Sequence, residues 1–318
     1  MKCVLWVTEA CNLRCKYCYI NAGYKVAPTE SLESIIRLID WLTTIRIEKL
    51  IIGGGEPLLR KDIFDILKRS AKTAETHLLT NGTLINEKSA QKLVLSGIDS
   101  VSVSLDSPAP EVHNEFRNGS FDAAVGGIKL CVKNGLSVDI AACIHKKNST
   151  HAASLIRFAE NIGAASVTFE GLNPVGRGEN CKDWTLTAKQ TDIFLQSVYD
   201  TLHDIKPSVQ VIIFYPQWVR WDRNAPGCEA GKNFFGLRSN GDVFPCTNLP
   251  ITVGNVWRED FSSIWNCKLM NDLRTKRNGG CNRCRYRERC GGCRSKAYAA
   301  GDMFGSDPSC PLAWEGDG

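Results

Sequence analysis

Three cysteines near the start of the chain are spaced to bind one metal centre. Cys11, Cys15 and Cys18 stand four and three residues apart, shortly after the apolar run at residues 3–7. A short run rich in Val, Leu and Trp predicts a β-strand, so one loop after it could aim all three thiols at a common centre. Because three thiols cannot complete a four-ligand site, the spacing predicts a metal centre with one position left for another ligand.

The choice of metal follows from this missing ligand. A structural zinc ion needs four protein ligands, which are usually supplied at short spacing along the chain. None of the five histidines lies near the three-cysteine loop. An iron-sulfur cluster held at three corners, with one iron open to a small molecule, suits the loop better than zinc does. Cysteines with a purely structural role are the alternative.

The octapeptide from residue 11 to residue 18, CNLRCKYC, resembles the CxxxCxΦC signature of the radical S-adenosylmethionine (SAM) enzymes, with Tyr17 at the aromatic position. The resemblance implies that Cys11, Cys15 and Cys18 hold a [4Fe-4S] cluster whose fourth iron is chelated by the amino and carboxylate groups of SAM. In that family, an electron from the reduced cluster cleaves SAM to methionine and a 5′-deoxyadenosyl radical, which abstracts hydrogen from the substrate. An external reductant such as ferredoxin or flavodoxin is an expected partner.

The rest of the N-terminal two thirds must position this loop. Short apolar runs alternate there with longer segments of helical periodicity, which predicts βα units and a parallel sheet. The six expected strands are residues 3–7, 49–52, 77–80, 100–105, 138–144 and 166–170. The expected helices are residues 31–43, 61–74, 87–96, 121–134, 151–162 and 188–203. Six units are too few for a closed eight-fold barrel, so we expect a partial (β/α)6 TIM-type barrel, open on one side.

Residues capable of chemistry follow the ends of the first four expected strands. The three-cysteine loop follows the first strand, GGGEP at residues 53–57 follows the second, and TNG at residues 80–82 follows the third. Ser104 and Asp106 end the fourth strand. Because all strand C-termini of a parallel barrel open on the same face, the sequence predicts an active site at this rim.

The glycine run resembles the GGE motif by which radical SAM enzymes bind the SAM amino group, which implies contacts from Gly54, Gly55 and Glu56. Consecutive glycines let the backbone approach a ligand closely, and a carboxylate can pair with an ammonium group. A tight turn with no ligand is the alternative interpretation of the same residues.

Three further polar residues near the rim are candidates for binding SAM. Ser104 and Asp106 sit where radical SAM enzymes place ribose or carboxylate contacts, and we expect Arg117 to meet the SAM carboxylate. A solvated loop and an exposed arginine are the alternatives.

A second group of seven cysteines occupies a region with many glycines and little apolar material for a core. Such a region needs another source of cohesion, which a bound metal supplies. Its members are Cys228, Cys246, Cys281, Cys284, Cys290, Cys293 and Cys310. A zinc ribbon made by residues 281, 284, 290 and 293 is one alternative.

The order of these seven cysteines resembles the SPASM domain of many radical SAM enzymes, which carries two auxiliary iron-sulfur clusters. One departure is the two-residue spacing between Cys290 and Cys293, where three residues are commonest. The resemblance implies two ligand sets, namely Cys281, Cys284, Cys290 and Cys310 for one cluster, and Cys228, Cys246 and Cys293 for the other. The second set is one ligand short, so its fourth site is open, unusual or filled by Cys267.

Composition limits the remaining possibilities. The 318 residues, 43% of them hydrophobic, suffice for a radical SAM core over residues 1–205 and a SPASM domain over residues 206–318. A net charge of +5 is no nucleic-acid signature. The 15 cysteines are an odd number, which argues against a complete disulfide framework and for metal ligation in a reducing compartment.

The start of the chain has no basic segment followed by a long apolar run, and no stretch approaches the ~18 apolar residues of a membrane span. We therefore expect a soluble, cytoplasmic protein with no membrane or nucleic-acid partner. Of the five other cysteines, we expect Cys3, Cys131 and Cys143 to be small buried hydrophobes and Cys181 to be exposed in a polar loop.

Several phrases resemble the radical SAM branch that includes the alternative haem and haem d1 biosynthesis enzymes. They are NGDVFPC at 240–246, VGNV at 253–256, CRYR at 284–287, CGGCR at 290–294, AYA at 297–299, GD at 301–302 and DPSC at 307–310. That branch implies hydrogen abstraction near a carboxylate of a modified tetrapyrrole, loss of carbon dioxide or a side-chain fragment, and uptake of the surplus electron by an auxiliary cluster. The basic residues Arg177, Arg220 and Arg223 would suit such an anionic substrate.

Two other functions stay open at this point. The same phrases also occur in SPASM maturases that modify ribosomally made peptides by a thioether, a carbon-carbon link or epimerisation, and in other cofactor-maturation enzymes. A metal-binding scaffold or electron carrier without radical chemistry is the hypothesis from another class, and it predicts no cleavage of SAM.

Overall fold

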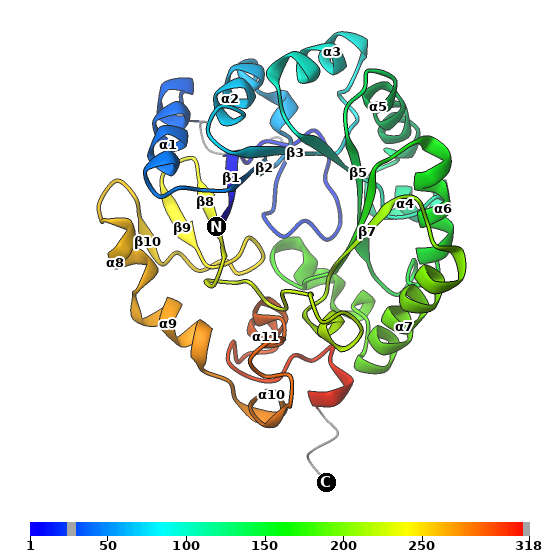
Figure 1. Cartoon of the computed structure of the whole chain (residues 1–318), viewed down its shortest axis with the longest axis vertical. Helices are drawn as coiled ribbons and strands as arrows, with labels where there is room; N and C mark the ends of the chain where they lie inside the picture. Colours follow the sequence, from blue (N-terminus) through cyan, green and yellow to red (C-terminus); the bar gives the residue numbers. More distant parts are fainter. Residues whose placement is uncertain (24–29, 314–318) are drawn as a thin grey trace.

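The computed structural model describes residues 1–23 and 30–313. Its strands form one sheet in the order β10-β9-β8-β1-β2-β3-β4-β5-β6-β7, and β1 to β7 pair in parallel as neighbours. These seven are β1 (Lys2–Thr8), β2 (Lys49–Gly54), β3 (Glu75–Thr80), β4 (Ser100–Ser104), β5 (Val138–Ile144), β6 (Ser166–Gly171) and β7 (Gln210–Phe214). The sheet curves into an open barrel (Figure 1), which confirms the predicted partial (β/α) barrel.

The barrel differs from the prediction at both of its edges. The sequence predicts six strands and a domain boundary at residue 205, just before Pro207, yet β7 follows that proline and pairs with β6. At the other edge β8 (Phe234–Arg238) pairs in parallel with β1, and β9 (Asp242–Phe244) and β10 (Gly254–Asn255) extend the sheet antiparallel. One sheet therefore contains strands from both sides of residue 205, and the division into residues 1–205 and 206–318 stays a prediction.

Helices cover the outer face of the sheet (Figure 1). They are α1 (Leu32–Thr44), α2 (Ile63–Ser70), α3 (Glu87–Ser96), α4 (Pro110–Phe116), α5 (Phe121–Lys133), α6 (Ala152–Ile162) and α7 (Ala188–Ile205). Each of the six helices expected from the sequence is present with bounds that differ by four residues or fewer, and α4 is additional. Asn86 caps the start of α3 with its side chain, which accepts a hydrogen bond from the N–H of Ser89.

The main core lies between the sheet and these helices, because side chains alternate across each strand. In β5, Val138 and Ile140 are buried on the helix side, while Asp139 faces the barrel interior. The Asp139 carboxylate accepts hydrogen bonds from the hydroxyls of Ser102, 2.6 Å away, and Ser166, 2.8 Å away. The interior of the barrel, which we call the lumen, is therefore lined partly by polar groups.

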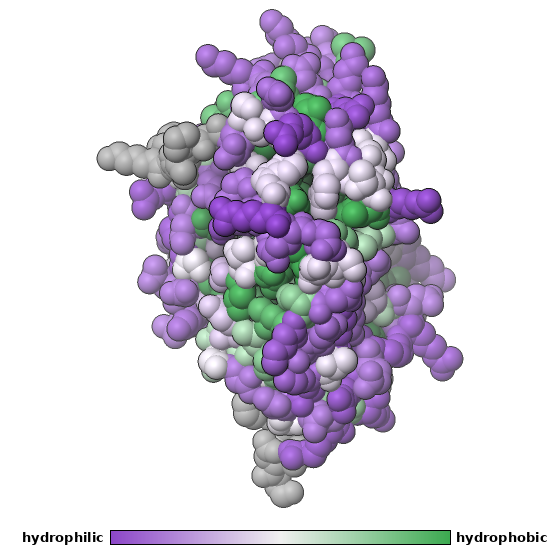
Figure 2. Space-filling view, turned by 90° about the vertical axis from the view of Figure 1, so that its left-hand side faces the viewer, coloured by the Kyte–Doolittle hydropathy of each residue, from purple (hydrophilic) through white to green (hydrophobic). Residues whose placement is uncertain are grey.

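Short helices of the C-terminal third lie at the open side of the barrel, between β10 and α7 (Figure 1). They are α8 (Phe261–Trp265), α9 (Lys268–Thr275), α10 (Gly279–Arg283) and α11 (Arg294–Ala299), and the 3-10 helices of the chain are η1 (Pro57–Leu59), η2 (Gly176–Trp184), η3 (Pro216–Arg220) and η4 (Pro311–Ala313). Hydrophilic side chains cover most of the face in Figure 2, with smaller apolar areas between them. None of the described helices is both long and apolar enough to cross a membrane.

Candidate active site

The three-cysteine loop begins where β1 ends and turns back on itself inside the barrel rim. The N–H of Cys18 donates to the carbonyl of Cys15, 3.3 Å away, and the N–H of Leu13 donates to Cys11 Sγ, 3.4 Å away. Burial raises the pKa of the Cys11 thiol to about 11, and the nearby thiols of Cys15 and Cys18 raise it as well. The fold thus brings the three predicted ligands into one neighbourhood.

Arg177 holds this loop in place, which the sequence did not predict. Its Nε donates to the carbonyl of Cys15, 2.9 Å away, its Nη1 to the carbonyl of Ala22, 2.7 Å away, and its own N–H to the carbonyl of Cys18. Its Nη2 is buried without a hydrogen-bond partner. Arg177 therefore anchors the three-cysteine loop through its backbone N–H, Nε and Nη1, and the hypothesis that it grips a substrate carboxylate stays a prediction.

The orphaned Nη2 of Arg177 also tests whether an anionic cluster fits here. A buried donor without a partner is costly, and a cluster held by thiolates would supply negative charge and sulfur acceptors beside it. Burial raises the pKa of the Cys15 thiol, and the guanidinium groups of Arg117 and Arg177 lie close enough to oppose that rise. The residues around the three thiols therefore fit an iron-sulfur cluster.

The glycines after β2 allow the second rim loop to press against the first. A Cβ built on Gly54, whose φ is 130°, would lie 2.1 Å from the carbonyl oxygen of Thr8, and one on Gly55 would lie 2.1 Å from that of Ala10. The N–H of Gly55 donates to the Thr8 carbonyl, 2.8 Å away. Close backbone packing is therefore the structural reason for both glycines.

Glu56 is fully buried and its carboxylate is already satisfied by protein groups. It accepts hydrogen bonds from the Leu58 N–H at 3.0 Å, the Thr80 hydroxyl at 2.8 Å and the Asn81 N–H at 2.8 Å. Burial raises its pKa, and these three hydrogen bonds oppose the rise. Glu56 thus joins the rim loops after β2 and β3, and any contact of this segment with SAM falls to its backbone.

Asp106, Arg117 and Tyr17 form one buried group beside the thiols. The Asp106 carboxylate accepts two hydrogen bonds from Arg117, at 2.9 and 3.1 Å, and one from the Tyr17 hydroxyl. Burial alone would raise the pKa of Asp106, but the Arg117 guanidinium outweighs it and holds that pKa below its usual value. The structure therefore brings three predicted SAM-binding residues together and makes Asp106 the group that fixes Arg117 next to Cys15.

Ser104 ends β4 on the lumen side of the sheet, the side that also carries a carboxylate that sequence reasoning missed. Glu170 lies two strands away, on the lumen side of β6, and its carboxylate accepts a hydrogen bond from Asn248 Nδ2 at 2.8 Å. Solvent reaches the Glu170 side chain, yet protein atoms surround it closely enough for burial to raise the pKa of its carboxyl. Both facts agree with a side chain that lines an internal space. The only signal for it in the sequence was an acidic residue at the end of an otherwise apolar strand.

Four of the C-terminal cysteines line one small cavity, and they are the four that the SPASM resemblance assigned to one cluster: Cys281, Cys284, Cys290 and Cys310. The N–H of Tyr286 donates to the Sγ of Cys284 and the N–H of Gly292 to the Sγ of Cys290, each at 3.4 Å. Cys293 does not line this cavity, so the arrangement supports the cluster set over the zinc-ribbon set.

The other three C-terminal cysteines also converge. Burial raises the pKa of Cys246, and the thiols of Cys228 and Cys293 raise it further because they lie nearby. The N–H of Cys228 donates to the carbonyl of Cys290, 2.9 Å away, which ties this set to the four-cysteine cavity. Across residues 1–23 and 30–313, no group of three or more His, Cys, Asp or Glu side chains is arranged around a single metal ion.

Cys267 precedes α9 and lies near Arg274, where its thiol opposes the burial that lowers the pKa of that guanidinium. We therefore expect Cys267→Ala to leave the iron content and the absorption spectrum of the anaerobically reconstituted protein unchanged. Cys246→Ala is the matched comparison and should lose iron. A fall in iron in the Cys267 variant would instead make Cys267 the fourth ligand.

The remaining cysteines divide between confirmed and corrected predictions. Cys3 and Cys131 are fully buried in the main core, as predicted. Cys143 is half-buried on the lumen side of β5, where its N–H donates to Asp106. The expectation that Cys181 is exposed was wrong: it packs with Tyr17 under the three-cysteine loop, because η2 folds back over that loop.

Comparisons with known proteins agree with this geometry. The radical SAM superfamily matches residues 7–159, and the SPASM iron-sulfur cluster-binding domain matches residues 228–294. The AdoMet-dependent heme synthase of Methanosarcina barkeri is 29% identical over 96% of this chain and 95% of its own length. The pre-heme d1 synthase of Dinoroseobacter shibae is 26% identical over 97% and 86%.

Among solved structures, Streptococcus suis SuiB bound to its precursor peptide SuiA superposes with a TM-score of 0.81. The match covers 98% of this chain and 75% of SuiB, at 17% identity, and so it shows a shared fold alone.

Proposed function

The chain belongs to the radical SAM superfamily, and from that membership we propose that it is an enzyme that removes carbon dioxide or a side-chain fragment from a modified tetrapyrrole. Cys11, Cys15 and Cys18 would hold the SAM-binding [4Fe-4S] cluster, and the two C-terminal sets would hold auxiliary clusters. When bound, the cluster and SAM supply hydrogen-atom abstraction from a substrate carbon. The auxiliary clusters would take up the electron left after the side chain is lost.

The observation that carries this proposal is the position of the lumen, between the three-cysteine loop and the C-terminal set that contains Cys246. Burial raises the pKa of Tyr19, and the next contributions come from Glu170, Cys18 and Cys246, all of which lie near its hydroxyl. Cys18 belongs to the N-terminal trio and Cys246 to the C-terminal one. A substrate in the lumen beside Glu170 would therefore lie between the SAM site and an auxiliary cluster.

Aromatic side chains around the lumen suit a flat, apolar macrocycle. Trp6 packs against Tyr19 and Phe244, with ring centroids 6.0 and 5.0 Å apart. Phe214 pairs with Glu170 across β6 and β7 and is 54% exposed on the lumen side. Aromatic rings are a common feature of sites for large apolar ligands. The similarity to heme and pre-heme d1 synthases supports the same substrate class.

Protein groups at the rim would position SAM against the cluster. The backbone of Gly54, Gly55 and Glu56 would face its amino group, Ser104 would face the ribose, and Arg117 would face the carboxylate. Asp106 would position Arg117 by accepting its hydrogen bonds, and the Tyr17 hydroxyl donates to the same carboxylate. Because Arg117 keeps two hydrogen bonds to Asp106, its orientation is set before SAM arrives.

We also infer the conditions under which the enzyme works. It would work in the reducing cytoplasm, where thiols remain available as cluster ligands, and the first electron would come from a ferredoxin or flavodoxin. The guanidinium of Arg220 has partners within the protein. It forms an ion pair with Asp192 and packs on the Trp221 ring, so we do not assign Arg220 to the substrate.

The test is a substrate comparison with the anaerobically reconstituted protein, SAM and dithionite. We expect a porphyrin that carries propionate side chains to raise the rate of 5′-deoxyadenosine release at least about tenfold, a lowering of the barrier by about 1.4 kcal/mol. Mass spectrometry should show loss of carbon dioxide or a side-chain fragment from the porphyrin. A matched control is the same assay with the porphyrin methyl ester.

Three outcomes separate the functions. Release of 5′-deoxyadenosine that no tetrapyrrole stimulates would contradict the proposed substrate. Stimulation by a short peptide encoded beside this gene would favour the maturase. An absence of SAM cleavage by the fully loaded, reduced protein would favour an electron carrier.

A further inference from the structure

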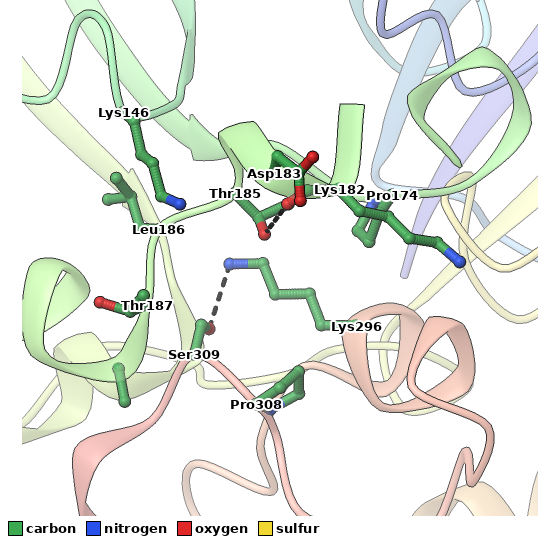
Figure 3. A pocket seen from close by; sticks show the side chains of 11 residues that line it. Lys146, Pro174, Lys182, Asp183, Thr185, Leu186, Thr187, Lys296, Pro308 and Ser309 are labelled. Atoms are coloured by element: carbon green, nitrogen blue, oxygen red, sulfur yellow. Dashed lines mark hydrogen bonds between the residues drawn. The ribbon is translucent and has the colours of Figure 1, made fainter. Parts of the chain in front are cut away.

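A pocket opens beside the lumen, between η2, the start of α7, α11 and the segment before η4 (Figure 3). Its lining contains three lysines and one carboxylate, namely Lys146, Lys182, Lys296 and Asp183. We call it the lysine pocket. The excess of ammonium groups over carboxylates indicates an anionic ligand.

Lys296 is the innermost of the three lysines. It extends from α11 across the pocket (Figure 3), is only 8% exposed, and donates to the Ser309 hydroxyl at 3.1 Å. None of the ion pairs formed within residues 1–23 and 30–313 includes Lys296. A buried ammonium group without a carboxylate at contact distance is costly, so an anionic ligand would stabilise it.

Tyr215 provides a second and independent sign of a ligand. Its side chain is buried at 3% exposure, and its hydroxyl has no hydrogen-bond partner. The Lys296 ammonium lies 4.9 Å from the centre of its ring. A buried hydroxyl left without a partner costs roughly 1–3 kcal/mol, which a ligand oxygen would recover.

Both groups meet at the end of β6. A Cβ built on Gly171 would lie 2.8 Å from Lys296 Nζ and 2.9 Å from the Tyr215 hydroxyl oxygen, so both donors crowd against the bare backbone there. Gly171 follows Glu170, the carboxylate that lines the lumen. The ammonium and the hydroxyl therefore stand together at the end of β6, where Lys296 lines the lysine pocket and the Tyr215 ring packs on Phe194 of α7.

We propose that Lys296 and Tyr215 form a carboxylate-binding subsite that anchors one acidic side chain of the substrate. An ammonium and a phenol hydroxyl supply the two donors that the two oxygens of a carboxylate accept, and such charge-assisted hydrogen bonds are strong. The nearby carboxylates are already engaged: Glu170 accepts from Asn248, and Asp307 accepts from Gln217 at 2.8 Å. Neither forms an ion pair with Lys296, although the Lys296 ammonium lies close enough to Glu170 to oppose the rise that burial causes in the pKa of that carboxyl. The identification of the acid as a tetrapyrrole propionate rests on the proposed function, whereas the subsite itself does not.

The first experiment tests the subsite without assuming a substrate. Propionate is the probe, and the readout is acetylation of Lys296 by acetic anhydride, followed by mass spectrometry of the whole reconstituted protein. We expect propionate to slow acetylation of Lys296 several-fold while the exposed Lys268 reacts as before. In Tyr215→Phe, protection should require about tenfold more propionate, equivalent to about 1.4 kcal/mol. Acetylation of Lys296 that saturating propionate leaves unchanged would overturn the subsite.

The second experiment tests the assignment to a tetrapyrrole. A porphyrin with free propionates and its methyl ester are titrated separately, and absorbance changes report binding. We expect wild type to bind the acid about tenfold more tightly, Lys296→Met to lose this preference, and Lys296→Arg to recover part of it. Lys189→Met, at an exposed position on α7 outside the pocket, is the matched control.

The outcomes of the two experiments are distinguishable. An acid preference that persists in Lys296→Met overturns the subsite and leaves the proposed function intact. If the wild-type protein binds neither porphyrin, the tetrapyrrole assignment is overturned. The protection of Lys296 from acetylation by propionate then still decides whether the subsite exists.

Discussion

Cys15→Ala is expected to reduce 5′-deoxyadenosine formation at least about 10³-fold, a rise of about 4 kcal/mol in the effective barrier. Cys15 lies between the other two thiols of the loop, and its carbonyl is held by Arg177. Without its thiolate, the cluster retains two protein ligands and no defined site for SAM. Iron content should fall by about four atoms per chain, because the [4Fe-4S] cluster of this loop is lost while the auxiliary clusters remain.

The matched control is Cys131→Ala, which removes the same sulfur from a fully buried position on α5 in the main core. It should cost about 1 kcal/mol of folding stability and leave SAM cleavage near the wild-type rate. Anaerobic reconstitution, iron analysis and chromatography of the nucleoside product provide the measurements. Full iron content together with wild-type SAM cleavage in Cys15→Ala would contradict the assignment of the cluster to this loop.

Gly55→Ala is expected to lower SAM cleavage about 10²-fold without touching a cluster ligand, because a shift of about 1 Å at a reacting centre has an effect of this size. The added methyl would lie 2.1 Å from the Ala10 carbonyl oxygen and 2.8 Å from that of Glu9, both backbone atoms. Those residues lead directly into Cys11. The two rim loops must therefore separate, which breaks the 2.7 Å hydrogen bond from the Glu56 N–H to the Ala10 carbonyl.

Gly126→Ala provides the control for this substitution. Gly126 lies on α5 with no atom within 4 Å of the position of an added Cβ. In a helix, Ala should increase stability by about 0.5–1 kcal/mol and leave activity unchanged. The change that SAM induces in the spectrum of the reduced cluster should need a higher SAM concentration in Gly55→Ala. A variant with wild-type activity and an unaltered SAM titration would show that the loops do not need this contact.

The sequence alone determined those features that depend on neighbouring residues. The first six parallel strands, their helices and the three-cysteine loop follow from apolar periodicity and from the spacing of thiols within eight residues. The likeness of that loop to the radical SAM signature indicated the family. The grouping of Cys281, Cys284, Cys290 and Cys310 depended on the same kind of resemblance, and all four line one cavity.

The seventh strand shows where local patterns mislead. Residues 210–214 have the apolar composition of a strand, but a preceding proline suggested the end of a domain. Their place in the sheet depends on the open edge of β6, whose paired residues lie 44 positions earlier in the chain. Likewise, β8 joins β1 across more than 200 residues, because the first strand would otherwise have a free edge.

Only the tertiary structure decided the roles of the charged residues. Arg177 reaches back 162 residues to the Cys15 carbonyl, and Asp106 binds Arg117 and Tyr17 rather than facing an open site. Lys296 and Tyr215 meet only because α11 folds against the end of β6. The physical reason is that a residue type states which bonds a side chain can make, whereas the fold decides which partners come within reach. In this protein, spacing along the chain identified the thiols, and long-range packing determined what each surrounding charge does.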